Sequence, residues 1–205
     1  MRKLLFLTFT IVLALSLPVD LLYSQTSDKE MRELLKSLKN EKKINFIFDM
    51  SQAKIHRKSE AEFVYLEDLN SLYDWASLWE VEYKPNLIHD FLVAFTSQMT
   101  YRGNKVKFGD YADAKYQIRI VVKLIAPKGS TKMQAFFEDA VKQSVLFQLD
   151  IVGIGGVFGS KVNLMGDGFK EAGKDLAKQL DYVFRKGKVG KFNKKPFVEK
   201  SFPLI

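Results

Sequence analysis

Alternating apolar and polar residues mark one strand clearly, over residues 116–126 (YQIRIVVKLIA). One face carries Tyr116, Ile118, Ile120, Val122 and Leu124, and the other carries Gln117, Arg119 and Lys123. A Pro-Lys-Gly turn and two more strand-like runs, at 131–139 and 144–152, come next. We therefore predict a meander of three consecutive strands. Two shorter strands are predicted upstream, at residues 44–49 (INFIFD) and 105–108.

Apolar residues that recur with a period of 3.6 predict three helices, at residues 28–43, 87–102 and 168–185. Pro85-Asn86 is expected to form a turn before the second helix, and Asp167 is expected to cap the third. Ser59 and Glu62 have the spacing of a capping box, so a further, brief helix is expected to begin near residue 60.

The predicted order of elements places a run of strands between two long helices. This order indicates an α+β fold in a single domain, residues 44–185. We expect an antiparallel-rich sheet of about four to five strands, with two main helices packed on one face. Residues 25–43 are expected to form an N-terminal helical segment, either on the surface or against a partner.

The first residues have the pattern of a cleavable signal peptide. Arg2 and Lys3 precede an apolar run, Leu4 to Leu17, that is too short to span a bilayer. Cleavage after Ser24 would define a signal peptide of residues 1–24, and the alternative is an uncleaved anchor. We expect an exported protein of the periplasm or cell surface. It is not expected to be a lipoprotein, because the chain has no cysteine.

The formal charge of +8 is concentrated near the C-terminus, where residues 185–200 hold seven Lys or Arg against one Glu. The rest of the chain is close to neutral, unlike a nucleic-acid-binding surface, so no nucleic acid is expected as a partner. Residues 186–205 are expected to form a basic, flexible tail. The alternative is a tether to an anionic membrane or polymer surface, through Lys188, Lys191, Phe192, Lys194, Lys195 and Phe197.

The sequence contains no recognisable arrangement for catalysis, metal binding or nucleotide binding. The two histidines, His56 and His89, lie in separate segments without the spacing of a zinc site, and no metal or cofactor is expected. Residues 153–159 (GIGGVFG) follow a strand, as a dinucleotide-binding loop does. However, Phe158 stands where the third glycine of that motif belongs, and no P-loop lysine follows, so no nucleotide is expected.

Two interpretations of the glycine-rich segment 153–168 stay open at the level of sequence. In the first, the glycines permit positive φ or close backbone approach as the chain leaves the sheet for its last helix. In the second, the segment is a partner-binding loop that contacts an envelope protein or membrane through its apolar residues: Ile154, Val157, Phe158, Leu164 and Met165.

Residues 158–176 (FGSKVNLMGDGFKEAGKDL) resemble a C-terminal signature, FGSKxNLMGDGFxxAGxxL, of an uncharacterised family of small exported proteins from Gram-negative bacteria. Similarity in layout covers most of residues 44–184, including INFIFDMSQAKIH and DAKYQIRIVVKLIAPKG. This resemblance implies export and assigns no activity to any residue. The order of elements is also similar, in topology alone, to the N-terminal domain of TolB and to CsgG-type lipoproteins, from which this chain departs by lacking a lipobox cysteine.

These observations predict a non-catalytic interaction or assembly module of the cell envelope. The alternative is an envelope hydrolase that acts on glycan or peptide through a pair of carboxylates, which the sequence alone does not identify. A third hypothesis is ligand binding by the region of Trp75 and Trp79, which requires those rings to line a pocket.

Overall fold

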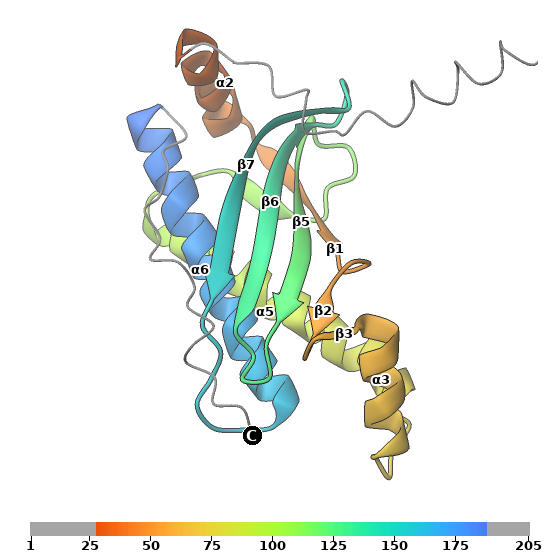
Figure 1. Cartoon of the computed structure of the whole chain (residues 1–205). Coiled ribbons are helices and arrows are strands. Elements are labelled where there is room, and N and C mark those ends of the chain that lie inside the picture. The colour runs from red at the N-terminus through yellow and green to blue at the C-terminus, as the bar shows by residue number, and fades with distance from the viewer. Residues whose placement is uncertain (1–27, 188–205) are drawn as a thin grey trace, which may run out of the picture.

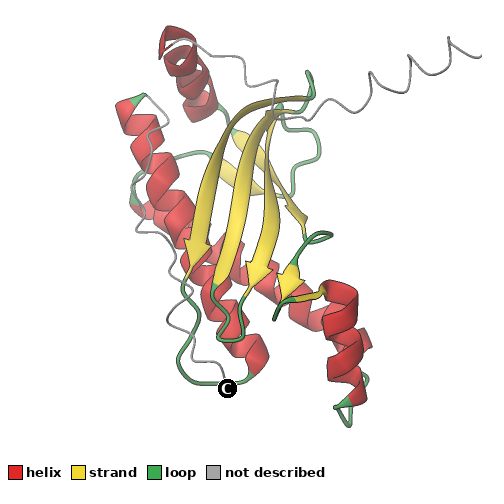
Figure 2. Cartoon of the chain, viewed as in Figure 1, coloured by secondary structure: helices red, strands yellow, loops and turns green. Residues whose placement is uncertain are grey.

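The computed structural model describes residues 28–187, which form a twisted sheet with helices packed behind it (Figures 1 and 2). The elements follow in this order: α2 (Asp28–Asn40), β1 (Lys43–Asp49), β2 (Lys54–Ile55), β3 (Lys58–Ser59), α3 (Glu60–Leu69), α4 (Trp75–Leu78), the π-helical η2 (Trp79–Tyr83), α5 (Lys84–Tyr101), β4 (Lys107–Gly109), β5 (Tyr116–Ile125), β6 (Thr131–Asp139), β7 (Ser144–Gly153) and α6 (Lys161–Lys186). The predicted α+β class is confirmed.

The sheet differs from the predicted one in both strand number and strand direction. Within residues 28–187 it has seven strands, and β5 is central. On one side β5 pairs with antiparallel β6, which pairs in turn with antiparallel β7. On the other side β5 pairs with β1 and β2, both parallel to it, and β4 is parallel to β1. The sheet is therefore mixed, because the helical crossover between β1 and β5 returns the chain in the same direction.

The alternation of residues along β5 correctly predicts which face is buried. Tyr116, Ile118, Ile120 and Val122 are buried on the helix side, while Lys123 on the other face is exposed. In Figure 2 helices lie behind the sheet, and no described helix covers its front face. One cluster of buried side chains joins the sheet to the helices, and it includes Leu35 and Leu38 of α2. The N-terminal helix is thus packed against the core.

The predicted turn at Pro85-Asn86 is wrong, because the helical run continues through it from α4 to α5. Pro85 lies in the first turn of α5, directly after the π-helical turn η2. There the backbone N–H of Lys84 donates to the carbonyl of Trp79, five residues earlier. A wider turn relieves the clash between a proline ring and the preceding turn, which would otherwise break or kink the helix.

The last helix begins seven residues earlier than predicted, at Lys161, and its cap is Ser160. The Ser160 hydroxyl accepts a hydrogen bond from the backbone N–H of Asn163 at 3.2 Å. Asp167 therefore lies inside α6, and its predicted role as a cap is wrong. By contrast the cap at Ser59 is confirmed, since its hydroxyl accepts from the backbone N–H of Glu62 at 3.2 Å.

Helix α6 runs beside the edge strand β7 and is bonded to it by side chains. The Asp175 carboxylate accepts from the backbone N–H of Val152 at 3.0 Å. The Gln179 amide donates to the backbone carbonyl of Asp150 at 2.9 Å. These bonds occupy edge groups that another strand would otherwise pair with, and they fix the position of α6 relative to the sheet.

Candidate functional site

Three connections meet at one end of the sheet, which we call the loop end: the β2–β3 turn at 56–57, the β5–β6 turn at 126–130 and the β7–α6 loop at 154–160. The strand register brings them together, because Ile55 pairs with Ile125, Ile125 with Thr131, and Thr131 with Gly153. The backbone N–H of His56 also donates to the carbonyl of Ile125 at 2.8 Å.

Glycines hold the backbone of the loop end in close contact. A Cβ atom on Gly153 would overlap the carbonyl oxygen of Gly168, and one on Gly168 would overlap the carbonyl oxygen of Gly129. Two residues after Gly153 in the chain, Gly155 lies against the β5–β6 turn. Its backbone N–H donates to the Ser130 hydroxyl at 3.0 Å. The close-approach interpretation of the glycine-rich segment therefore describes its backbone.

The side chains of this loop point into solvent. Ile154 is 73% exposed, Val157 is 81% exposed and Phe158 is 89% exposed. We call these three residues the apolar loop. The glycine contacts hold the start of this loop, residues 153–156, against the β5–β6 turn and α6. Exposed apolar side chains that are clustered in this way are typical of a binding surface.

The other two residues of the predicted partner-binding loop are placed differently. Met165 is fully buried in the core, so its assignment to a binding surface is wrong. Leu164 is half-buried. Both lie on α6, because that helix begins at Lys161, and Met165 falls on its core-facing side. The six predicted tether residues of the tail (Lys188, Lys191, Phe192, Lys194, Lys195 and Phe197) and the predicted signal peptide lie outside the described residues.

Four cations surround the loop end, and the sequence analysis missed them as a group. They are Lys54, Arg57, Lys58 and Lys128, which we call the cationic rim. Lys54, Arg57 and Lys128 are exposed, Lys58 is half-buried, and none of the four forms an ion pair within residues 28–187. The dense basic run KIHRK at 54–58 was the available signal.

His56 lies beneath this rim and has an unusual environment. His56 and Arg57 both have positive φ, 51° and 70°, in a two-residue turn that usually takes Asn or Gly. The His56 ring packs edge-on against Phe63, with centroids 4.9 Å apart, and Nε2 has no hydrogen-bond partner among the described residues. Burial lowers the pKa of His56, and the nearby Lys161 charge lowers it further.

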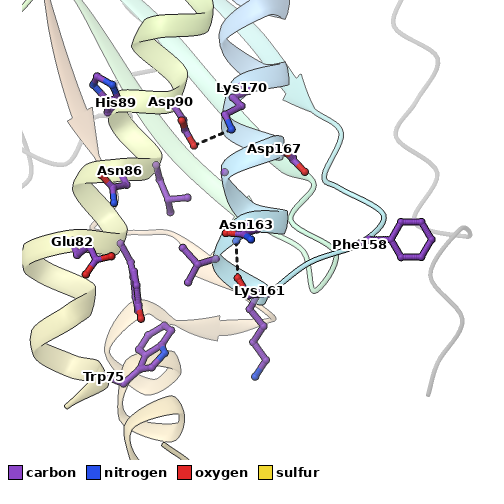
Figure 3. Close-up of a pocket in the computed structure, with 15 residues that line it drawn as sticks. Trp75, Glu82, Asn86, His89, Asp90, Phe158, Lys161, Asn163, Asp167 and Lys170 are labelled. Atoms are coloured by element: carbon purple, nitrogen blue, oxygen red, sulfur yellow. Dashed lines mark hydrogen bonds and ion pairs between the residues drawn. The ribbon is translucent and has the colours of Figure 1, made fainter. Parts of the chain in front are cut away.

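A groove of about 800 Å³ adjoins the loop end, between the first turns of α5 and α6 (Figure 3). Asp90 of α5 and Lys170 of α6 face each other across it and form an ion pair at 3.5 Å. Glu82 of η2 and His89 of α5 line the groove, and so does Phe158, although its ring points away from α5 in Figure 3. The apolar loop therefore borders the groove through Phe158, while its other two residues, Ile154 and Val157, do not line it.

The carboxylates that line the groove do not converge on one point. Asp90 is paired with Lys170, and the Asp167 carboxylate lies against the loop backbone, where a Cβ on Gly156 would collide with it. A glycosidase-type mechanism needs two carboxylates that face each other across the bound substrate. Within the part of the chain that the structure describes, no group of three or more His, Cys, Asp or Glu could hold a metal ion.

The two tryptophans occupy unequal positions. Trp79 is fully buried, and its indole N–H donates to the Glu60 carboxylate at 2.8 Å. Trp75 stacks on it, with centroids 5.5 Å apart, and lines the lower end of the groove. Glu60 also pairs with Lys84 at 2.8 Å, which ties α3 to α5. Trp79 is therefore a core residue, and only Trp75 is available to a ligand.

Comparisons with known proteins add no functional information. No family model matches the chain, and no curated protein matches it. Among solved structures, the chain is similar to protein XCC0632 from Xanthomonas campestris, assigned to family DUF330, with a TM-score of 0.30 and 10% identity. The match covers 46% of this chain and 61% of that one. A likeness this distant carries no argument about function.

Proposed function

We propose that this chain is a non-catalytic interaction module of the cell envelope, which binds its partner through the loop end. The observation that carries the proposal is the apolar loop: three apolar side chains, each at least 73% exposed, in a segment whose first residues, 153–156, are held by close glycine contacts. Burying such side chains against a partner gains hydrophobic free energy at little conformational cost, because the backbone is already ordered.

Export is a premise of this proposal. It rests on the apolar N-terminal run and on the resemblance of residues 158–176 to the signature of exported Gram-negative proteins. No helix within residues 28–187 is long and apolar enough to cross a membrane. Attachment to the envelope by this part of the chain would therefore occur at a surface.

The groove gives weaker support to the alternative function, an envelope hydrolase. It is large enough for a small ligand, but Asp90 is neutralised by Lys170 and Asp167 faces the loop backbone. A hydrolase would need these groups to rearrange when substrate binds. The apolar loop needs no rearrangement to contact a partner.

Sedimentation with envelopes tests the proposal. The purified full chain is mixed with washed envelope fragments, and the pelleted fraction is compared with that of the double variant Val157→Ser, Phe158→Ser. The control is Val141→Ser, Tyr101→Ser, since those two side chains are 77% and 88% exposed at sites remote from the loop end. We expect the loop variant alone to stay in solution. Equal sedimentation of both variants would refute the proposal.

A further inference from the structure

We propose that the partner of the loop end is an anionic lipid surface, into which Ile154, Val157 and Phe158 insert while the cationic rim contacts the headgroups. This inference rests on the proposed function and names its partner. The surface carries both features that bind a protein peripherally to a membrane: exposed apolar side chains, and cations that form no ion pair within residues 28–187.

The rim is placed around the apolar loop by the sheet itself. The β2–β3 turn, which carries Arg57, is three strand spacings from the end of β7, or about 14 Å. Lys128 lies between them, in the turn whose carbonyl contacts Gly155. The charge of Lys161, which follows the loop, is close enough to His56 to lower its pKa, although burial lowers it more. The three connections thus form one continuous surface.

The charge balance of this surface is positive. Glu67 is neutralised by Lys161 at 2.6 Å, and the Asp167 carboxylate is turned toward the backbone of Gly156. The four rim cations have no such partners within the described residues. This positive charge would be complementary to anionic headgroups. The same charge favours a lipid surface over an apolar groove on a protein as the partner. Binding to such a groove would not require the four rim cations, which have no ion-pair partner within the described residues.

The opposite end of the sheet provides a matched internal control. There the β6–β7 turn at 140–143, which we call the hairpin end, exposes Val141 (77%) and Lys142. These two residues are chemically equivalent to Val157 and Lys128 of the loop end. If a membrane binds the loop end specifically, substitutions at Val157 and Lys128 will weaken membrane binding. Substitutions at Val141 and Lys142 will leave it unchanged.

A fluorescence experiment tests the inference directly. The chain contains no cysteine, so Val157→Cys and Val141→Cys each give a single site for a polarity-sensitive fluorophore. Each labelled full-length protein is mixed with vesicles of phosphatidylcholine alone, or with vesicles that also contain phosphatidylglycerol. We expect a blue shift at position 157 with the mixed vesicles only, and no shift at position 141.

Charge variants measure the contribution of the rim. A cation near a membrane surface contributes about 1 kcal/mol, which corresponds to about a fivefold change in partitioning. Lys58→Gln and Lys128→Gln are each expected to weaken binding to the mixed vesicles about fivefold, and Lys142→Gln is expected to leave it unchanged. Phe158→Ser should weaken it at least about tenfold, since an aromatic side chain leaves the membrane.

Each result discriminates between the two proposals. If the labelled chain binds the mixed vesicles but position 157 stays in water, another part of the chain makes the contact, and the lipid inference is overturned. If vesicles do not bind while envelope fragments still bind through the apolar loop, the partner is a protein, and only the lipid inference fails. If neither binding depends on the loop, both proposals fail.

Discussion

The loop end and the hairpin end of the sheet both expose apolar side chains, but their backbones are held differently. At the hairpin end the bonds are mostly local: the Asp139 carboxylate accepts the backbone N–H groups of Val141 and Lys142, at 3.0 and 2.9 Å, and the N–H of Ala140 donates to the carbonyl of Lys115 at 2.9 Å. At the loop end the backbone is fixed by Gly129, Gly153 and Gly168, which belong to a turn, a strand and a helix. Exposure at the loop end is therefore a product of tertiary packing.

This difference bears on how each surface should be interpreted. The hairpin turn is held mainly by its own Asp139, and a side chain at its tip is exposed because tight turns lie on the surface. The apolar loop belongs to the loop end, which is built from parts far apart in the sequence. It would lose its shape if any one of them moved, so its exposed residues depend on the whole fold. Four measurements test whether the loop end depends on the whole fold in a way that the hairpin end does not.

The largest expected effect is that of Gly153→Ala. Its new Cβ would overlap the carbonyl oxygen of Gly168, a backbone atom that cannot move without displacing α6. We expect a loss of at least about 4 kcal/mol in the free energy of unfolding, measured from urea denaturation. The control is Gly109→Ala in β4, where the Cβ would lie 3.5 Å from the Tyr111 ring and should change stability by less than about 1 kcal/mol. Equal costs would show that the loop end is not held by its glycines.

Met165→Ala is expected to be the next most destabilising change. This side chain is fully buried in the core, and its truncation leaves a cavity that costs about 2 to 4 kcal/mol. Leu164→Ala, at the half-buried neighbour, should cost about 1 kcal/mol. Thermal unfolding of the two variants measures the difference. If Met165→Ala does not change stability, Met165 is not a core residue, and its assignment to the binding surface would be restored.

A pH titration probes the loop end through His56. Burial lowers its pKa in the folded state below the unfolded value of 6.5, so the unfolded chain binds more protons between these two values. The stability from neutral His56 is complete above pH 6.5 and is lost as the pH falls from there through the lowered folded pKa. Urea midpoints between about pH 8 and about pH 5 measure this decline. His56→Asn, which tolerates positive φ, should flatten it, and a persistent decline would assign it to other groups.

The smallest expected effect on stability is that of Phe158→Ser. The side chain is 89% exposed, so its removal should change the free energy of unfolding by less than about 0.5 kcal/mol. Val141→Ser at the hairpin end should behave in the same way. The urea midpoints of both variants are compared with that of the unchanged chain. A cost of about 2 kcal/mol at Phe158 alone would mean that its ring packs on the protein, which contradicts an available binding surface.

The sequence predicts the elements that have strong periodicity. The strands β1, β5, β6 and β7 and the buried face of β5 follow from alternation, and the helices α2 and α5 follow from apolar stripes. The parallel pairing of β1 with β5 did not follow, because alternation gives the face of a strand and not its neighbour. The β2–β3 hairpin was missed, since its turn uses His56 and Arg57 in place of Asn-Gly.

The start of α6 was misplaced for a reason that also explains Met165. Gly166 and Gly168 lower helix propensity in the first turns, which suggested a loop up to residue 168. In the structure these glycines allow close packing, and packing outweighs propensity. The apolar loop itself was predicted as a candidate, because Ile154, Val157 and Phe158 are too apolar for an ordinary connection. Three residues of the cationic rim were visible as the basic run at 54–58, but the strand register was needed to place Lys128 beside them.

The length of α6 sets how far the chain reaches from any surface that the loop end contacts. The helix begins one residue after Ser160 at that end, and its 26 residues extend about 39 Å at 1.5 Å per residue. It ends at Gly187, whose φ of 65° terminates the helix. The domain thus acts as a rigid spacer. Whatever is joined to the chain after Gly187 begins up to about 39 Å from the contact made by Phe158, a separation set by helix length.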